Sequence, residues 1–198
     1  MKVLIAYATG EGQTRKIATS VADWVRGRGH DVFLLDSASM AGDFRAQGFG
    51  AFIIAGSLHY KKHQKSLIRF VKKNRGVMLH APGLFLSVSS VAVREDEDGQ
   101  AIALSCIGKF IEQTGWLPTV SMPVGGAMMY TKYKFVLRAL LKKICEREGG
   151  PTDTSRDYEF TDWTALESAV SRFLSQYVDS ANRRVKHVED PAILVSNP

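Results

Sequence analysis

The chain has 198 residues, of which 45% are hydrophobic and 23% charged, and it carries a formal net charge of +6 with a pI near 9.4. This length and composition predict a single soluble domain with a sizeable core, and no apolar run reaches the ~20 residues that a membrane span needs. The chain starts with a strand-like run rather than a basic segment and a leader core, so we expect no signal peptide and a cytoplasmic protein. The positive charge favours anionic partners.

Apolar strand-like runs alternate with helical patterns along the chain. We predict strands near residues 2–8, 31–36, 50–56, 82–89 and 118–125. We predict helices near 14–28, 64–75, 101–115 and 161–178, with a weaker one near 40–46. This alternation predicts an α/β fold of flavodoxin-like order, with a five-stranded parallel sheet and helices on both faces. We expect one domain over residues 1–178, with an insertion at about 130–160 before the last helix and a flexible C-terminal tail over 179–198.

The loop after the first predicted strand, residues 9–14, combines hydroxyl side chains with two glycines. The glycines allow a tight turn whose N–H groups point inward, and the next helix aims its positive N-terminal end at the same place. These features predict a phosphate site, although an ordinary strand–turn–helix connection has the same outline. The loop lacks the lysine of a P-loop and the three-glycine dinucleotide spacing, so the pattern favours FMN as cofactor. The predicted phosphate-binding residues are Thr9, Gly10, Glu11, Gly12, Gln13 and Thr14.

The loops after the third and fourth predicted strands must face the same site in a doubly wound sheet. Small residues in both loops allow the backbone to approach a flavin ring, and Tyr60 either lies against that ring or packs on its own loop. The second loop has no aromatic residue, so we expect one flavin face to stay open to a flat organic substrate. The predicted ring-binding residues are Ser57, Leu58, His59 and Tyr60 in the first loop, and Ser87, Val88, Ser89, Ser90 and Val91 in the second.

Neither the histidines nor the cysteines of the chain predict a metal site. His59 and His63 have a spacing that binds metal ions on a helix, but no third ligand is evident. Cys106 and Cys145, the two cysteines, lack metal-ligand spacing and fit a reduced compartment. We therefore expect no metal and assign no catalytic residue.

Residues 131–147 have the pattern of a basic amphipathic helix. Tyr133, Leu137, Leu140, Leu141 and Ile144 are expected to share one face, and six lysines and arginines occupy the rest of the circumference. Such a helix either contacts an anionic membrane at the inner face of the cell membrane or packs its apolar face on the domain core. Both hold if the apolar face packs and the basic face meets lipid headgroups.

With these loops in place, the chain resembles the menaquinone-dependent protoporphyrinogen IX dehydrogenases, FMN proteins of the flavodoxin fold. The resemblance covers about residues 2–178, and its most specific part is the insertion, which ordinary flavodoxins lack. The segments that carry it are Glu11 to Arg15, the loop ending in Tyr60, Phe70 to Lys73, Ser87-Val88, Gly125-Gly126-Ala127 with Tyr130 and Tyr133, and Gly149 to Thr154 with Tyr158, Thr161, Asp162 and Trp163.

The resemblance implies oxidation of protoporphyrinogen IX to protoporphyrin IX in haem biosynthesis, with FMN accepting the electrons and a membrane quinone receiving them. Two alternatives remain: a flavin-dependent quinone reductase with a nicotinamide donor, and a non-enzymatic electron carrier. No nucleic-acid module is recognised, so we expect no nucleic-acid partner. By loop position, Arg94, Lys132 and Lys134 are candidates to bind the substrate propionates. Glu11 departs from ordinary flavodoxins, and we expect it to contribute only backbone to the phosphate site.

Overall fold

A computed structural model describes residues 1–40, 43–59, 61–94 and 96–181 and contains one main β-sheet. Its parallel strands are β1 (Lys2–Ala8), β2 (Asp31–Asp36), β3 (Ala51–His59), β5 (Gly83–Ser89) and β6 (Val120–Gly125). They lie in the order β2-β1-β3-β5-β6, and the short strand β4 (Lys62–His63) pairs antiparallel with β3. The predicted five parallel strands and their doubly wound order are confirmed, and β4 adds a sixth strand that the sequence pattern did not predict.

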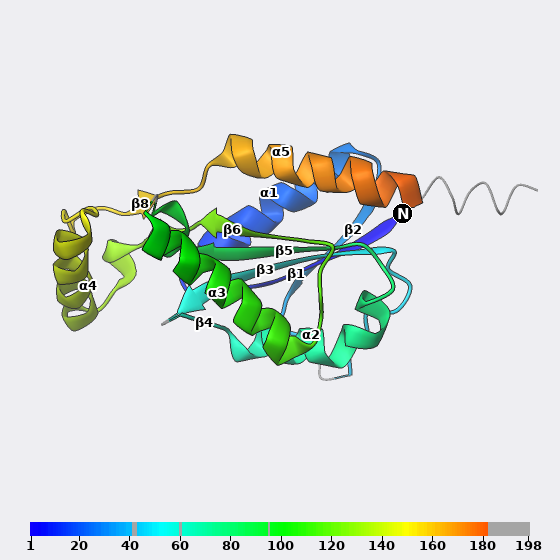
Figure 1. Cartoon of the computed structure of the whole chain (residues 1–198), viewed down its shortest axis with the longest axis horizontal. Helices are drawn as coiled ribbons and strands as arrows, with labels where there is room; N and C mark the ends of the chain where they lie inside the picture. Colours follow the sequence, from blue (N-terminus) through cyan, green and yellow to red (C-terminus); the bar gives the residue numbers. More distant parts are fainter. Residues whose placement is uncertain (41–42, 60, 95, 182–198) are drawn as a thin grey trace, which may run out of the picture.

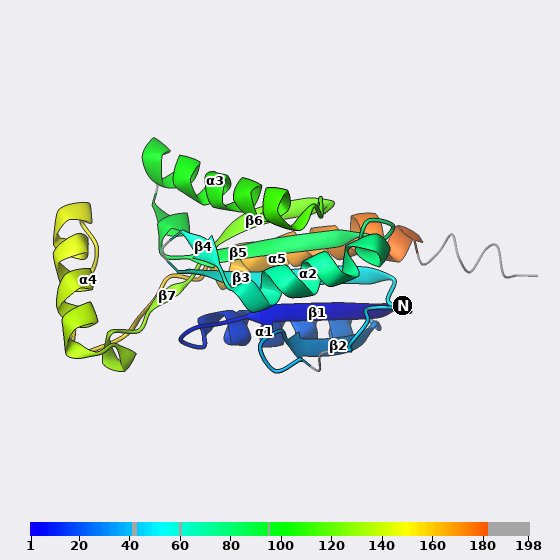
Figure 2. The same ribbon diagram turned by 90° about the horizontal axis from the view of Figure 1, so that it is seen from below.

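Helices cover both faces of this sheet (Figures 1 and 2). On one face lie α1 (Gln13–Gly27) and α5 (Trp163–Phe173), which a π-helical turn over Leu174–Val178 continues; on the other lie α2 (Lys65–Met78) and α3 (Glu97–Thr114). Alternation along β1 divides the core, because Val3 and Ile5 pack against the first pair while Leu4 and Ala6 pack against the second. Burial on both faces explains why these strands read as nearly continuous apolar runs.

The weak helix predicted near 40–46 is wrong for the residues that the structure describes there. Residues 43–46 form a turn and an irregular segment, and residues 41–42 lie outside the described part. The backbone N–H of Ala46 donates to Asn74 Oδ1 of α2 at 2.8 Å, and Phe44 stacks on Phe33 with ring centroids 5.7 Å apart. These long-range contacts outweigh a weak local helix preference.

The insertion before α5 extends beyond the carboxyl edge of the sheet (Figures 1 and 2). Its base is a two-stranded antiparallel pair, β7 (Ala127–Met128) with β8 (Tyr158–Glu159), and between these strands lies α4 (Phe135–Glu148). The helix starts later than predicted, because residues 130–132 form a 3₁₀ turn and Lys134 has the extended backbone of an N-cap. Among the described helices, none combines the length and apolar character needed to cross a bilayer.

The end of the described chain is fixed to the sheet edge away from the insertion. Helical structure continues to residue 181, beyond the predicted start of the tail at 179. Asp179 lies 2.9 Å from His30 Nε2 and 3.6 Å from Arg28 Nη1. The rest of the predicted tail, residues 182–198, lies outside the described residues.

Candidate functional site: a cofactor cavity beneath the insertion helix

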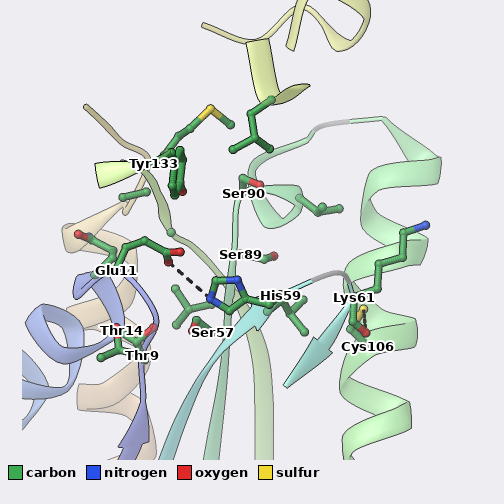
Figure 3. Close-up of a pocket in the computed structure, with 18 of the residues that line it drawn as sticks. Thr9, Glu11, Thr14, Ser57, His59, Lys61, Ser89, Ser90, Cys106 and Tyr133 are labelled. Carbon is green, nitrogen blue, oxygen red and sulfur yellow. Dashed lines mark hydrogen bonds and ion pairs between the residues drawn. The ribbon is translucent and has the colours of Figure 1, made fainter. Parts of the chain in front are cut away.

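A cavity of about 380 Å³ lies at the carboxyl ends of β1, β3 and β5, with α4 on its far side (Figure 3). This is the edge where a doubly wound sheet binds its ligand. The core loops contribute Thr9, Glu11, Gln13, Thr14, Ser57, Leu58, His59 and Val88 to Val91, and the insertion contributes Gly126 to Met128 and the apolar side of α4. The cavity therefore combines the first loop of the chain with an insertion that begins more than 100 residues later.

The loop after β1 has the geometry of an anion site. Gly12 adopts a φ of 107°, which favours glycine, and its N–H donates to Thr9 Oγ1 at 2.9 Å. Thr14, in the first turn of α1, is 1% exposed and lines the cavity, and its Oγ1 has no hydrogen-bond partner among the described residues. A buried hydroxyl without a partner is unfavourable unless a ligand satisfies it. Its place at a helix N-terminus makes a phosphate the ligand that fits.

Glu11 and His59 face each other across this loop (Figure 3). Glu11 Oε2 lies 3.6 Å from His59 Nε2, and both residues line the cavity. His59 also lies close to Gly10, where a Cβ would be 2.2 Å from Nε2, so a larger residue at position 10 would require the imidazole to move. The Glu11 carboxylate is thus turned toward His59 at the cavity wall, and the expectation that Glu11 contributes only backbone to the phosphate site stays a prediction.

The insertion is tied to the same loop by a set of polar contacts. Gln13 Nε2 donates to Glu159 Oε1 at 3.0 Å and to Thr161 Oγ1 at 2.9 Å, and Lys16 forms an ion pair with Glu159 at 2.7 Å. Burial alone would raise the pKa of Glu159, but hydrogen bonds from Lys16, Gln13 and Trp163 hold it below its usual value. On the other side, Lys132 Nζ donates to the carbonyl oxygen of Glu11 at 2.6 Å. The start of α1 is thus clamped by both ends of the insertion.

The loop after β5 lines the cavity from Val88 to Val91, but Ser87 lies elsewhere. Ser87 is fully buried, and its Oγ is 3.1 Å from His63 Nε2, because alternation along β5 turns it toward α2 and α3. Ser87 is therefore corrected from a cofactor contact to a core residue. His63 packs against Phe85 and Phe110, and burial lowers its pKa to about 4.

The apolar side of α4 faces the cavity rather than a packed core. Leu137, Leu140, Leu141 and Ile144 line the cavity, yet Leu140 remains 50% exposed and Ile144 39% exposed. Tyr133 lines it too, although it precedes the helix, and burial followed by the nearby Glu11 charge raises its pKa. The sequence left open whether this face packs on the domain core or the helix contacts a membrane, and in the structure the face lines the cavity.

Comparison with known proteins places these features in a family. Residues 4–155 match the Flavodoxin domain family. The chain belongs to this family. Its sheet order and the cavity at the carboxyl edge of the sheet agree with this assignment.

Relatives extend the match beyond the fold. Protoporphyrinogen IX dehydrogenase (quinone) from Escherichia coli strain K12 is 29% identical over 163 residues, covering 82% of this chain and 89% of the relative. The protein of the same name from Leishmania major is 28% identical over 176 residues, covering 87% of this chain and 74% of the relative. The family and these names agree with the predicted class, a quinone-linked FMN oxidoreductase.

Two solved structures share the flavodoxin fold. Oxidised flavodoxin 1 from Bacillus cereus superposes with a TM-score of 0.54 at 10% identity, covering 89% of this chain and 99% of that one. The apo form of an NADH:FMN oxidoreductase superposes with a TM-score of 0.53 at 12% identity, covering 89% of this chain and 90% of that one. At these identities the likeness concerns the fold alone.

FMN is the cofactor of this flavodoxin domain, as predicted. The loop between Thr9 and Thr14, where the buried Thr14 hydroxyl has no partner among the described residues, would hold its phosphate, and the loops at Ser57 to His59 and Ser89 to Val91 would hold the ring. When bound, FMN supplies the electron-transfer chemistry, and the protein binds, orients and tunes it. Tyr60, the predicted aromatic neighbour of the ring, lies outside the described residues.

The three predicted substrate cations are not brought together in this flavodoxin domain. Lys132 donates its hydrogen bond to the Glu11 carbonyl oxygen. Lys134 is exposed at the N-cap of α4 and is not among the residues that line the cavity. Arg94 forms a two-pronged contact with Asp96 at 2.8 and 3.1 Å and lines a second, adjoining cavity. The sequence pattern assigns no role to Glu159, which lies near the end of the insertion. A single acidic residue at this position forms no sequence pattern that would predict its contact with Gln13.

Proposed function

We propose that this protein oxidises protoporphyrinogen IX to protoporphyrin IX through bound FMN and passes the electrons to a quinone. The two curated relatives named above support the substrate pair. The observation that carries the proposal is the apolar side of α4, which lies across the FMN cavity instead of packing on the domain core. A tetrapyrrole is a large, flat and largely apolar ligand, and such a ligand needs apolar surface beyond the flavin itself.

A non-enzymatic electron carrier would not need the apolar side of α4 across its flavin. A carrier exchanges electrons with protein partners at an exposed flavin edge and gains nothing from a helix that narrows access to it. The chain is also basic, with a net charge of +6, whereas carriers commonly dock through acidic surface on basic reductases. A quinone reductase with a nicotinamide donor remains the alternative, and it differs from the proposal in its electron donor.

The deciding experiment is anaerobic turnover of the FMN-loaded protein with protoporphyrinogen IX, followed by porphyrin fluorescence. The proposal expects porphyrin to form rapidly only when a menaquinone analogue is present. Replacing the macrocycle with NADH tests the alternative in the same cuvette. Quinone reduction by NADH without porphyrin formation from protoporphyrinogen would favour the reductase and reject the proposal.

We further propose that α4 holds the cavity mouth against an anionic membrane at the cytoplasmic side, where a lipid-soluble quinone is available. The outward side of the helix supports this, because Phe135 is 81% exposed and Val136 is 78% exposed. Lys142, two turns after Phe135, shares its side of the helix, and Lys134 and Lys143 add exposed positive charge nearby. Exposed aromatic and basic residues on one helix are typical of an interfacial contact.

A further inference from the structure

A second cavity, of about 410 Å³, adjoins the FMN cavity along the exposed side of α3. The two cavities share Lys61, Ile102 and Cys106 as lining residues, so a ligand in one can extend into the other. Figure 3 shows Lys61 and Cys106 together on the α3 side of the site. Lys61 is the one cation among the described residues that line both cavities.

The second cavity is lined mainly by positive charge. Lys61, Arg94 and Lys109 supply three cations, and Asp98 is the single carboxylate among the described lining residues, so the formal balance is three minus one, or two positive charges. Arg94 is held in place by its contact with Asp96. The ammonium groups of Lys61 and Lys109 form no ion pair with a carboxylate of the described residues. A cavity with this charge is suited to carboxylates.

The backbone at Lys61 points to a functional reason for the side chain there. Lys61 has a φ of 60°, the one positive φ at a non-glycine residue in the described chain. A left-handed conformation is unfavourable for a residue with a Cβ, and glycine or asparagine would adopt it more easily. Cys106 Sγ contacts the Lys61 carbonyl at 3.7 Å and fixes this turn against α3. An unfavourable backbone held at a ligand site suggests that the side chain is needed.

We propose that this second cavity is the propionate subsite for the macrocycle bound over the flavin, with Lys61 and Lys109 neutralising the two carboxylates. The proposal rests on the proposed function and adds to it a preference for substrates with carboxylate side chains. The tetrapyrrole ring would lie between the flavin and the apolar side of α4, and its propionates would extend along α3. Lys61 lies at the junction of the cavities, and Lys109 lies further along the same side of α3.

The test compares protoporphyrin IX, a dicarboxylate, with its dimethyl ester, using quenching of porphyrin fluorescence by the FMN-loaded protein. The variant is K61Q with K109Q, and the matched control is K65Q with K72Q, which removes two exposed lysines from α2, outside both cavities. Flavin content, measured by absorbance, checks that each variant is folded and loaded. Turnover adds a second readout, the KM for protoporphyrinogen IX against the KM for the quinone.

We expect the site variant to bind protoporphyrin IX about tenfold more weakly and to bind the ester as the unsubstituted protein does. Its KM for protoporphyrinogen IX should rise while its KM for the quinone stays unchanged. Equal losses for porphyrin and ester, equal losses in the α2 control, or no loss at all would overturn the subsite while leaving the proposed function intact. If the unsubstituted protein neither binds porphyrin nor oxidises protoporphyrinogen IX, the proposed function fails, and the subsite with it.

Discussion

Gln13, the first residue of α1, donates a hydrogen bond from Nε2 to Glu159 Oε1 in β8, 146 residues away and 3.0 Å distant. The contact joins the phosphate loop to the base of the insertion. Trp163 Nε1 donates to the same carboxylate oxygen at 2.8 Å, which connects α5 to this point as well. The insertion is therefore braced against the cofactor loop and not merely appended to the sheet.

Replacing Glu159 by alanine should weaken FMN binding, because Gln13 and Lys16 would lose their common acceptor. A hydrogen bond to a charged group contributes roughly 1.5–3 kcal/mol, and partial exposure of this carboxylate reduces that to about 1 kcal/mol, or fivefold in Kd. Flavin fluorescence titration measures the change. Asp153→Ala is the matched control, because the polar contacts of this insertion acid within the described part of the chain go to its neighbours Ser155 and Arg156. Equal affinity in both variants would mean that the Glu159 contacts do not support the phosphate loop.

Thr14→Val should weaken FMN binding and leave the fold intact. The change removes the buried hydroxyl that lacks a partner and preserves the side-chain shape, so stability should not fall. Loss of a hydrogen bond to a charged phosphate corresponds to roughly 1.5–3 kcal/mol, which raises Kd by about tenfold or more. Titration with FMN checks this, and thermal unfolding without flavin is the control. An unchanged Kd would show that Thr14 does not contact the phosphate.

The membrane proposal predicts that Lys134, Lys142 and Lys143 act together. Changing all three to glutamine should reduce co-sedimentation with anionic vesicles by about a hundredfold in affinity at low salt, since each basic residue near such a surface contributes ~1 kcal/mol. High salt should narrow the difference. The control is a triple glutamine variant at Lys65, Arg69 and Lys72, exposed residues of α2. If both variants lose the same binding, the attraction comes from net charge and not from α4.

Burial of His63 predicts a stability that depends on pH. Its pKa is lowered to about 4 in the folded protein, so the unfolded chain binds a proton more readily, and stability is greatest above the unfolded pKa of ~6.5. Stability should fall as pH drops from 6.5 toward 4, by roughly 2 kcal/mol at pH 5. Urea unfolding at pH 5 and pH 7.5 measures this difference. His63→Gln keeps a hydrogen-bonding side chain beside Ser87 and should remove most of this difference in stability between the two pH values. If the difference is as large in the variant, groups other than His63 cause it.

The sequence predicted the fold well because its signals are local. The apolar strands, the helical periods and the glycines of the loop at residues 9–14 each follow from neighbouring residues, and the structure and the family agree with them. The error at 40–46 and the missed strand β4 have the opposite origin. Ala46 is fixed by Asn74 of a distant helix, and a two-residue strand carries no periodic pattern.

The site was less predictable because it depends on contacts between distant segments. Loop composition placed Thr14 and His59 at the cavity, but it could not reveal that Ser87 turns into the core toward His63. The apolar face of α4 was predicted, although nothing local to the helix says whether that face meets core, lipid or ligand. Lys61 and Lys109 line one cavity because of how α3 packs near Lys61, which no spacing in the sequence encodes.

The most direct measurement of the central claim is the ratio of quinone reduced to porphyrin formed, under anaerobic conditions, with protoporphyrinogen IX as the only electron donor. Conversion to protoporphyrin IX releases six electrons and each quinone accepts two, so the account predicts three quinones reduced for every porphyrin, with the rate depending on FMN loading. Porphyrin formation that does not depend on the quinone, or quinone reduction without porphyrin, would contradict it.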